Sequence, residues 1–490
     1  MFETAEVGNK LDKKTYHKEV PELRAELLEA QRELARSPLS VVILVSGVEG
    51  AGKSETMNLL LEWLDPRGIT THAMWDMTDE ERERPAMWRF WRVLPPSGRI
   101  GIMLGSWYTT PIVDRVFGRT DDAELDQALD RIVELERMLT AEHTIVLKLW
   151  MHIAKPVQRK RLEDLERDPK TSWRVRKQDW RFFKRYDEFR TVSEHVLRRT
   201  STGEAPWHIV EASDPRWRGV AVGRIVLDAL RDRLAAVRKE ERPQHNPHMP
   251  VPEPVNVLSQ LDRTLRLSDK AYERQVENIQ GKLNRSVRKL GGAGHSAILV
   301  FEGPDAAGKG GAIRRLIACL DARHYQVTSV AAPTDEERAH PYLWRFWRNL
   351  PRRGRVTIYD RSWYGRVLVE RLEGFATPEE WGRAYAEING FEEQLVEYGI
   401  VVAKFWLAVS PEEQLRRFKD RQLTPYKQYK ITEEDWRNRK KWKAYEAAAC
   451  DMIERTSTEI APWTLVEADD KNWARVKVLK TVLKRLTQAT

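Results

Sequence analysis

Short apolar runs alternate with longer amphipathic stretches along the chain. In the first half the apolar runs are Val41–Val45, Ile100–Leu104, Ile145–Trp150 and Trp207–Val210. Runs of this length are typical of buried strands, and the helical patterns between them fit helices that cover a sheet. Strands that alternate with helices predict a parallel sheet flanked by helices on both faces. We therefore expect an α/β fold.

The same pattern occurs again 256 residues later, without a gap. The runs of the second half are Ala297–Phe301, Val356–Tyr359, Val401–Leu407 and Trp463–Val466. Polar and aromatic blocks keep the same offset, since Thr78–Arg82 corresponds to Thr334–Arg338 and Trp88–Arg92 to Trp344–Arg348. An amphipathic segment precedes the first run of each half, at Leu23–Leu34 and Tyr272–Leu290. A period of this length indicates a tandem duplication of a whole domain rather than a solenoid.

A proline-rich segment separates the two copies. Prolines stand at positions 243, 247, 250, 252 and 254. Such spacing favours a stiff, extended connection. We expect a first domain at 1–240, a linker at 241–257 and a second domain at 258–490.

Composition excludes several classes of protein. The chain has 490 residues, of which 41% are hydrophobic, so global disorder is excluded. Cys319 and Cys450 are its 2 cysteines, which excludes a disulfide-stapled scaffold and a four-cysteine zinc site. No apolar run approaches the ~18 residues that span a bilayer, and the first twenty or so residues carry no secretory signal. We expect a cytoplasmic protein without a membrane partner.

The net charge of +9 is modest and allows a polyanionic partner without requiring one. Neither a base-reading helix nor zinc-ligand spacing accompanies it, so we expect no nucleic-acid partner.

Each copy carries a glycine-rich loop directly after its first apolar run. Gly47–Ser54 fits the full phosphate-loop pattern, in which glycine amides, a helix N-terminus and a lysine bind phosphate. Gly303–Gly310 lacks the hydroxyl residue after Lys309. Its predicted phosphate-binding residues are Gly303, Ala306, Ala307, Gly308, Gly310 and Gly311.

The second copy nevertheless carries the residues that phosphoryl transfer needs. Its run Val356–Tyr359 is followed by Asp360 and Arg361, with Arg366 shortly beyond. A metal that bridges phosphates usually needs a carboxylate at the end of a neighbouring strand. In the first copy these three positions are Leu104, Gly105 and Thr110. We therefore expect the second domain to be the catalyst, with Asp305, Lys309, Asp360, Arg361 and Arg366 as its catalytic residues.

Asp305 and Asp360 are the predicted metal-binding pair, and either could also accept a proton. Asp305 lies inside the loop, where Glu49 stands in the first copy. A loop-stabilising turn is the structural alternative for Asp305, and a helix N-cap is the alternative for Asp360.

A basic stretch after the apolar run Val401–Leu407 of the second copy fits a mobile lid. In small-molecule kinases a lid at this place closes over the phosphates and excludes water. The predicted lid residues are Arg417, Arg421, Lys427 and Lys430. A solvated basic helix face is the alternative for each.

Tryptophans at helical spacing occur in both copies, at Trp88 and Trp91 and at Trp344 and Trp347. Because the copy that lost its metal ligands keeps them, we expect core packing. Base stacking is the alternative.

Taken together, the motifs of the second copy resemble the polyphosphate kinase type 2 family. The blocks that carry the resemblance are Gly303–Gly311, Pro333–Glu337, Leu343–Trp347, Asp360–Arg366 and Ala461–Trp463. The tandem layout resembles the two-domain branch of that family, whose members convert AMP to ADP. The resemblance implies thymidylate-kinase-like, P-loop kinase-like domains, each with a helical lid.

The resemblance further implies Mg²⁺ as cofactor, and inorganic polyphosphate and AMP as substrates. The phosphate of AMP would attack the terminal phosphate of the chain. An ATP-dependent nucleotide kinase, polyphosphate-driven phosphorylation of ADP or GDP, and a non-enzymatic polyphosphate-binding regulator are the alternatives. The sequence leaves open the role of the first domain, the acceptor preference, the chain-length preference, the direction of the reaction and homo-oligomerisation.

Overall fold

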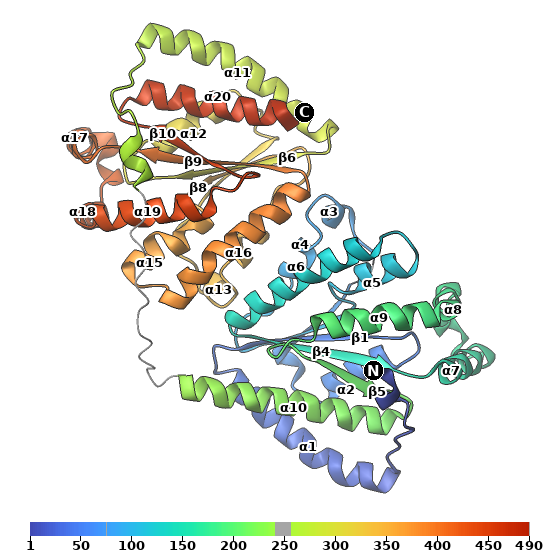
Figure 1. The fold of residues 1–490 in the computed structure, drawn as a ribbon. Coiled ribbons are helices and arrows are strands. Elements are labelled where there is room, and N and C mark those ends of the chain that lie inside the picture. Colours follow the sequence, from blue (N-terminus) through green and yellow to red (C-terminus); the bar gives the residue numbers. More distant parts are fainter. Residues whose placement is uncertain (75, 241–255, 490) are drawn as a thin grey trace. The chain divides into compact units, whose positions relative to one another are not determined.

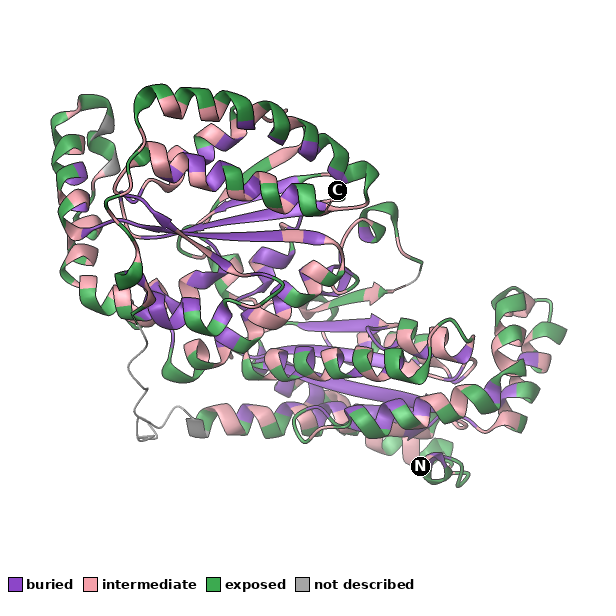
Figure 2. Cartoon of the chain, turned by 45° about the horizontal axis from the view of Figure 1, so that its top comes forward, coloured by how far each residue is buried: buried purple, intermediate pink, exposed green. Residues whose placement is uncertain are grey.

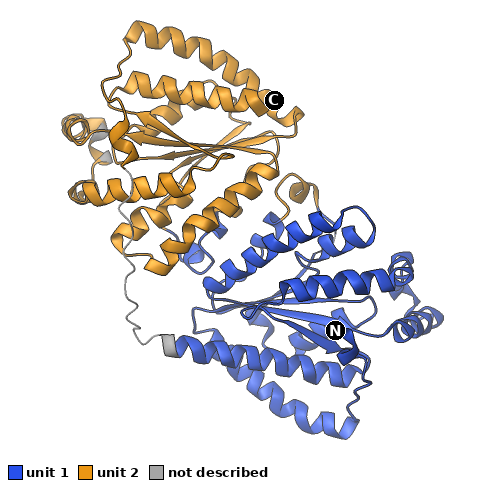
Figure 3. Ribbon diagram, in the orientation of Figure 1, with its two compact units in different colours: residues 1–77, 87–247, 333–345 blue, residues 78–86, 248–332, 346–490 orange. Residues whose placement is uncertain are grey.

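The chain folds into two compact units (Figure 3). The computed structural model describes residues 1–74, 76–240 and 256–489. Unit 1 is Met1–Met77, Met87–Pro247 and Pro333–Arg345, and unit 2 is Thr78–Ala86, His248–Ala332 and Phe346–Thr490. Residues 241–255, which make up most of the predicted linker, lie outside the described residues.

Unit 1 contains a five-stranded parallel sheet with the strand order β2-β3-β1-β4-β5 (Figure 1). The strands are β1 (Ser40–Gly47), β2 (Ile69–Ala73), β3 (Ile100–Leu104), β4 (Thr144–His152) and β5 (Trp207–Glu211). Its helices are α1 (Lys13–Leu34), α2 (Lys53–Trp63), α4 (Trp88–Trp91), α5 (Thr109–Val116), α6 (Asp122–Ala141), α7 (Lys155–Arg167), α8 (Lys177–Lys184), α9 (Tyr186–Thr200), α10 (Pro215–Glu240) and α13 (Asp335–Arg338). Helices α1, α2 and α10 pack together on one face of the sheet, and α5, α6 and α9 pack together on the other.

Unit 2 repeats this architecture with the equivalent order β7-β8-β6-β9-β10. The strands are β6 (Ser296–Glu302), β7 (Tyr325–Ser329), β8 (Val356–Asp360), β9 (Ile400–Ala408) and β10 (Trp463–Glu467). Its helices are α3 (Asp79–Arg82), α11 (Asp269–Gly292), α12 (Lys309–Ile317), α15 (Val369–Glu373), α16 (Pro378–Glu397), α17 (Pro411–Leu423), α18 (Glu433–Lys440), α19 (Trp442–Thr456) and α20 (Lys471–Ala489). The short helix α14 (Trp344–Trp347) spans the division between the residues of the two units. The tandem α/β fold with parallel sheets is thereby confirmed.

The central strands are buried along almost their whole length, and Figure 2 shows them as the buried layer of each unit. Every residue of β4 and of β6 is buried, which is why the apolar runs predict these strands. No apolar run in the sequence predicts β2 or β7. Both are edge strands with half-exposed or exposed side chains, so they carry no apolar run.

A buried ion pair occupies the same place in both units. Lys148 Nζ lies 2.6 Å from Glu136 Oε2, and Lys404 Nζ lies 2.6 Å from Glu392 Oε2. The four side chains are at most 1% exposed. The pair connects β4 to α6 in unit 1 and β9 to α16 in unit 2. The two pairs are separated by the same 256 residues in the sequence. The duplication therefore extends to the buried polar contacts.

The repeated tryptophans belong to the core. Trp88, Trp91, Trp344 and Trp347 are each at most 4% exposed. This confirms the expected packing role. In the described part of the chain, no helix combines the length and the apolar character that a membrane span requires.

Candidate active site

The glycine-rich loop of the second domain joins β6 to α12 at the carboxyl edge of the sheet. Its backbone turns through left-handed conformations at Gly303 (φ 140°), Ala306 (φ 62°) and Gly308 (φ 113°). A Cβ atom at Gly303 would lie 2.6 Å from the carbonyl oxygen of Leu407, so the close approach to β9 requires glycine. The loop leads into the N-terminus of α12, where backbone N–H groups and the helix dipole favour an anion.

Lys309, the first residue of α12, closes the loop. Its Nζ donates to the carbonyl oxygens of Gly303 at 2.5 Å and Pro304 at 3.2 Å. Burial lowers the pKa of the Lys309 ammonium, an effect that the negative charge of Asp305 opposes. The lysine therefore fixes the shape of the loop and places a cation at its centre.

Asp305 is held by two donors from other elements. Arg361 Nη2 donates to Asp305 Oδ1 at 2.9 Å, and Asn438 Nδ2 of α18 donates to Oδ2 at 3.0 Å. Burial alone would raise the pKa of this carboxyl, but the charges of Lys309 and Arg361 and the two hydrogen bonds outweigh burial and lower it. Asp305 is therefore an oriented carboxylate.

Asp360 is the last residue of β8 and pairs in register with Phe301 of the neighbouring strand β6. A Cβ atom at Gly310 would lie 3.9 Å from Asp360 Oδ2. The glycine that replaces the expected hydroxyl residue thus leaves room for this carboxylate beside the start of α12. Arg361 follows in the left-handed conformation, with φ 65°, and its amide donates to the carbonyl of Phe301 at 3.1 Å.

These residues surround a cavity of about 660 Å³. The predicted residues that line it are Asp305, Ala306, Ala307, Gly308, Lys309, Gly310, Gly311, Asp360, Arg361, Arg417 and Arg421. Gly303 lies at the root of the loop and does not line the cavity. The side chains of Lys427 and Lys430 lie outside the described part of the structure.

Arg366 is the predicted catalytic residue that the structure does not bring to the cavity. Its side chain is 12% exposed and forms ion pairs with Glu370 at 3.1 Å and Glu380 at 3.5 Å. It points toward α15 and α16, and its catalytic role stays a prediction.

Arg417 on α17 contacts the loop rather than reaching over it. Its Nη1 donates to the carbonyls of Ala306 and Ala307 at 2.9 and 3.0 Å. Its Nη2 donates to the carbonyls of Ala468 and Asp469, and its Nε donates to Glu413. With 4% of its side chain exposed, Arg417 is a buried brace of the loop and not a lid residue at the surface.

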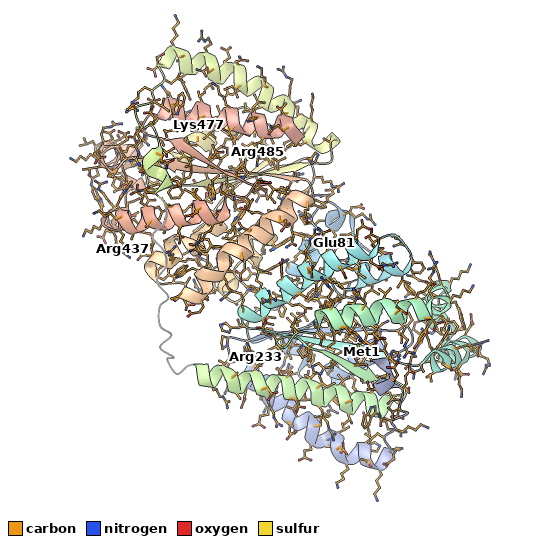
Figure 4. The ribbon with its side chains drawn as sticks, viewed as in Figure 1. Met1, Glu81, Arg233, Arg437, Lys477 and Arg485 are labelled. Atoms are coloured by element: carbon orange, nitrogen blue, oxygen red, sulfur yellow. The ribbon has the colours of Figure 1, made fainter. Side chains whose placement is uncertain are left out.

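Sequence reasoning missed three cations that line the cavity, namely Arg314 on α12 and Lys471 and Arg475 on α20. Arg475 lies against the start of α12, since a Cβ atom at Gly311 would be 3.8 Å from its Nη2. Lys477 and Arg485, which are labelled in Figure 4, connect α20 to the sheet. Lys477 pairs with Glu467 of β10 at 2.8 Å, and Arg485 donates to the carbonyl of Val402 in β9 at 3.2 Å.

A comparison of the copies could have found these cations. Seven lysines and arginines line the cavity of the second domain, and five of them are uncharged at the equivalent positions of the first. The five replacements are Asn58 for Arg314, Gly105 for Arg361, Leu165 for Arg421, Pro215 for Lys471 and Gly219 for Arg475.

The first domain keeps the two cations that hold its loop in shape. Lys53 donates to the carbonyl of Gly47 at 3.0 Å and also pairs with Glu49 at 2.9 Å. Arg161 donates to the carbonyl of Gly50 at 2.6 Å. The first domain therefore keeps the cations that bond to its loop, and it lacks five cations that line the cavity in the second domain.

Asp305 in the loop and Asp360 at the end of the neighbouring strand are the carboxylates considered as metal ligands, and Asp420, Glu434 and Asp435 also line the cavity. Within the described ranges, no group of three or more histidine, cysteine, aspartate or glutamate side chains could hold a metal. Asp305 and Asp360 both line the cavity and supply hard oxygen atoms. Mg²⁺ in phosphate-handling sites is commonly bound by one or two carboxylates plus substrate phosphates, so this pair fits that ion.

Comparison with known proteins gives consistent results over the full length. A model of the polyphosphate kinase 2 (PPK2) family matches residues 10–238 and 266–490. The polyphosphate:AMP phosphotransferase of Pseudomonas aeruginosa is 54% identical, with 98% of each chain covered. The polyphosphate:AMP phosphotransferase of Acinetobacter johnsonii is 37% identical, with 95% of this chain and 96% of that protein covered. A crystal structure from Pseudomonas aeruginosa superimposes with a TM-score of 0.90 at 51% identity, covering 100% of this chain and 99% of that one.

Proposed function

Since the chain belongs to the polyphosphate kinase 2 family, we propose that it transfers the terminal phosphate of inorganic polyphosphate to AMP and forms ADP. The observation that carries the proposal is the cavity of the second domain. Seven cations and the carboxylates of Asp305 and Asp360 line a single space of about 660 Å³ beside the loop. A polyanion has no base to be read, so charge and backbone N–H groups are what recognise it.

The transfer needs no covalent intermediate with the protein. An oxygen of the AMP phosphate attacks the terminal phosphorus of the chain, and the bond from that phosphorus to the bridging oxygen breaks. The products are ADP and a polyphosphate shorter by one phosphate. Catalysis then consists of positioning and of charge stabilisation.

The residues divide this work by their positions. The loop amides and Lys309 bind the terminal phosphate, and Arg361 stabilises the charge that develops on its oxygens. Arg314, Lys471 and Arg475 bind the phosphates that follow in the chain. Asp305, fixed by Arg361 and Asn438, faces the reacting phosphates as an oriented carboxylate.

Asp305 and Asp360 would hold Mg²⁺. When bound there, the ion neutralises phosphate charge and aligns donor and acceptor.

The first domain, within the predicted limits 1–240, has no catalytic role in this proposal. Leu104 and Gly105 stand where the second domain has Asp360 and Arg361. Lys53 is paired with Glu49, so its charge is already balanced.

The test is ADP formation from AMP with polyphosphate and Mg²⁺, without ATP. Asp360→Asn is expected to lose at least ~10³-fold in kcat, because it removes a metal ligand. Lys53→Ala removes the loop lysine of the first domain, which is equivalent to Lys309, and is expected to stay within ~10-fold of the native rate. If the native protein forms no ADP with polyphosphate but phosphorylates AMP with ATP, polyphosphate is not the donor and ATP takes its place. An equal loss in both variants would overturn the assignment to the second domain.

A further inference from the structure

The first domain contains a cavity of its own, of about 380 Å³. This volume falls within the range of roughly 300–1,000 Å³ that is usual for small-molecule sites. It lies at the carboxyl edge of the unit 1 sheet, between the loop that begins at Gly47 and the helices α5, α8 and α9. Nothing in the proposed transfer reaction uses it.

The cavity exists because bulky charged residues of the second domain are small in the first. Ser46 stands where the second domain has Glu302, and Gly105 stands where it has Arg361. The equivalent space in the second domain is lined by Glu302, Arg361 and Asn438 and measures only about 50 Å³. Loss of these side chains enlarged the space and removed the two charges that the second domain has at these positions.

Aromatic side chains form its walls. Tyr108, Trp150 and Tyr186 are at most 3% exposed, and Phe182 and Phe189 line the same space. The rings of Trp150 and Phe189 stack at 6.0 Å between centroids. The rings of Phe182 and Phe189, which are only partly buried, are suited to contact with a flat aromatic ring.

Lys53, Arg89 and Arg119 are the cations that line this cavity, against seven in the second domain, and this smaller number disfavours a long polyanion. Lys53 is engaged by Glu49 and by two loop carbonyls. The five cavity cations lost from the first domain are those that a chain of phosphates would require. A ligand here carries a ring and at most a single phosphate at the loop.

We propose that the first domain binds a purine nucleoside moiety in this cavity, as the nucleoside or as its monophosphate, and does not phosphorylate it. The ring stacks against the aromatic wall, and the ribose side faces the loop. The bound nucleoside is not phosphorylated, because Leu104 and Gly105 supply neither a metal ligand nor a cation. The proposal concerns binding alone and does not depend on the transfer reaction of the second domain.

The experiment is photolabelling of the full chain with 8-azidoadenosine and, separately, with 8-azido-AMP, followed by peptide mapping. We expect labelled peptides from residues 177–189, protected by an excess of adenosine or AMP. Labelling of second-domain peptides by 8-azido-AMP in the same sample serves as an internal control for the labelling reaction.

Ser46→Glu places in the cavity the carboxylate that the second domain carries, and is expected to reduce first-domain labelling at least ~10-fold, because it buries a charge beside the ring. Thr70→Glu adds the same charge on an exposed residue of β2 outside the cavity, and should leave the labelling unchanged. Phe182→Asn introduces the residue that the second domain has at the equivalent position 438 and removes part of the aromatic wall. It tests the same effect on labelling if Ser46→Glu does not fold.

Labelling with both probes indicates that the nucleoside suffices, and labelling with 8-azido-AMP alone indicates that the loop binds the phosphate. Either result supports the proposal. Labels confined to second-domain peptides would overturn it. So would first-domain labelling that persists unchanged in both Ser46→Glu and Phe182→Asn.

Discussion

Arg417 shows that the role of an arginine depends on the acceptors that its guanidinium N–H groups contact. By sequence it belongs to a basic stretch that fits a lid, yet its guanidinium is buried and every one of its nitrogen atoms donates to a carbonyl or a carboxylate. Four of these acceptors are main-chain carbonyls of the loop and of the segment after β10. The planar fork of arginine suits this arrangement, and lysine could not reproduce it.

Arg417→Met is therefore expected to lower the free energy of unfolding by about 3–5 kcal/mol, because it leaves Glu413 and the carbonyls without their buried partner. Phosphate transfer should fall at least ~10²-fold, since the loop loses its brace and shifts. Urea unfolding of the full chain and the rate of ADP formation check both effects.

The neighbouring Arg416 provides the control. Its side chain is 58% exposed and pairs with Glu413 and Asp420 at the surface. Arg416→Met should change stability by no more than about 1 kcal/mol. Similar losses in the two variants would show that Arg417 does not act through the loop.

At the scale of elements, two helices of the second domain bring their charges to one cavity. α12 begins at Lys309 and carries Arg314, and α20 begins at Lys471 and carries Arg475. The two helices pack against each other on the same face of the sheet. Residues more than 150 positions apart thus form one cationic surface.

This surface predicts a strong salt dependence for the donor. The logarithm of KM for polyphosphate should rise linearly with the logarithm of salt concentration, since bound phosphates release counterions. Arg475→Gln should lower the slope by roughly 0.7 to 0.9, the contribution of one phosphate contact. Steady-state kinetics at four or more salt concentrations measure it.

Lys484→Gln removes a charge from the exposed side of the same helix, away from the cavity, and should keep the native slope. An unchanged slope in Arg475→Gln would place the polyphosphate chain elsewhere.

At the scale of the whole molecule, both copies of a duplicated fold have kept the architecture, and the first copy lacks five of the seven cations that line the cavity of the second. The strand order and the buried lysine–glutamate pair are the same in both units. The retained loop cations, Lys53 and Arg161, are those that bond to the backbone. Residues needed for folding were kept, and residues needed to bind a polyanion were not.

Restoring two residues should therefore not restore catalysis. In an Asp360→Asn background, Leu104→Asp together with Gly105→Arg is expected to leave ADP formation below about 1% of the native rate, since the other four cavity cations are still absent. The same pair of changes on an otherwise native chain controls for folding and should retain activity. Recovery to within ~10-fold of native would show that the first domain needs only these two residues.

The apolar runs and their exact repeat determined the fold class and the duplication, because a parallel sheet covered on both faces needs uniformly buried strands. The sequence also predicted the two glycine-rich loops and the difference between Asp360 and Leu104. The ends of neighbouring parallel strands lie at one edge of the sheet, so residues at those ends are expected to lie close together. The exposed edge strands β2 and β7 carry no such pattern, and only the structure revealed them. The tertiary structure also decided what no local pattern contains: Arg417 turns inward, Arg366 pairs with Glu370, and Lys471 and Arg475 reach the site. Each of these depends on how helices pack over the sheet, and distant segments of the chain determine that packing.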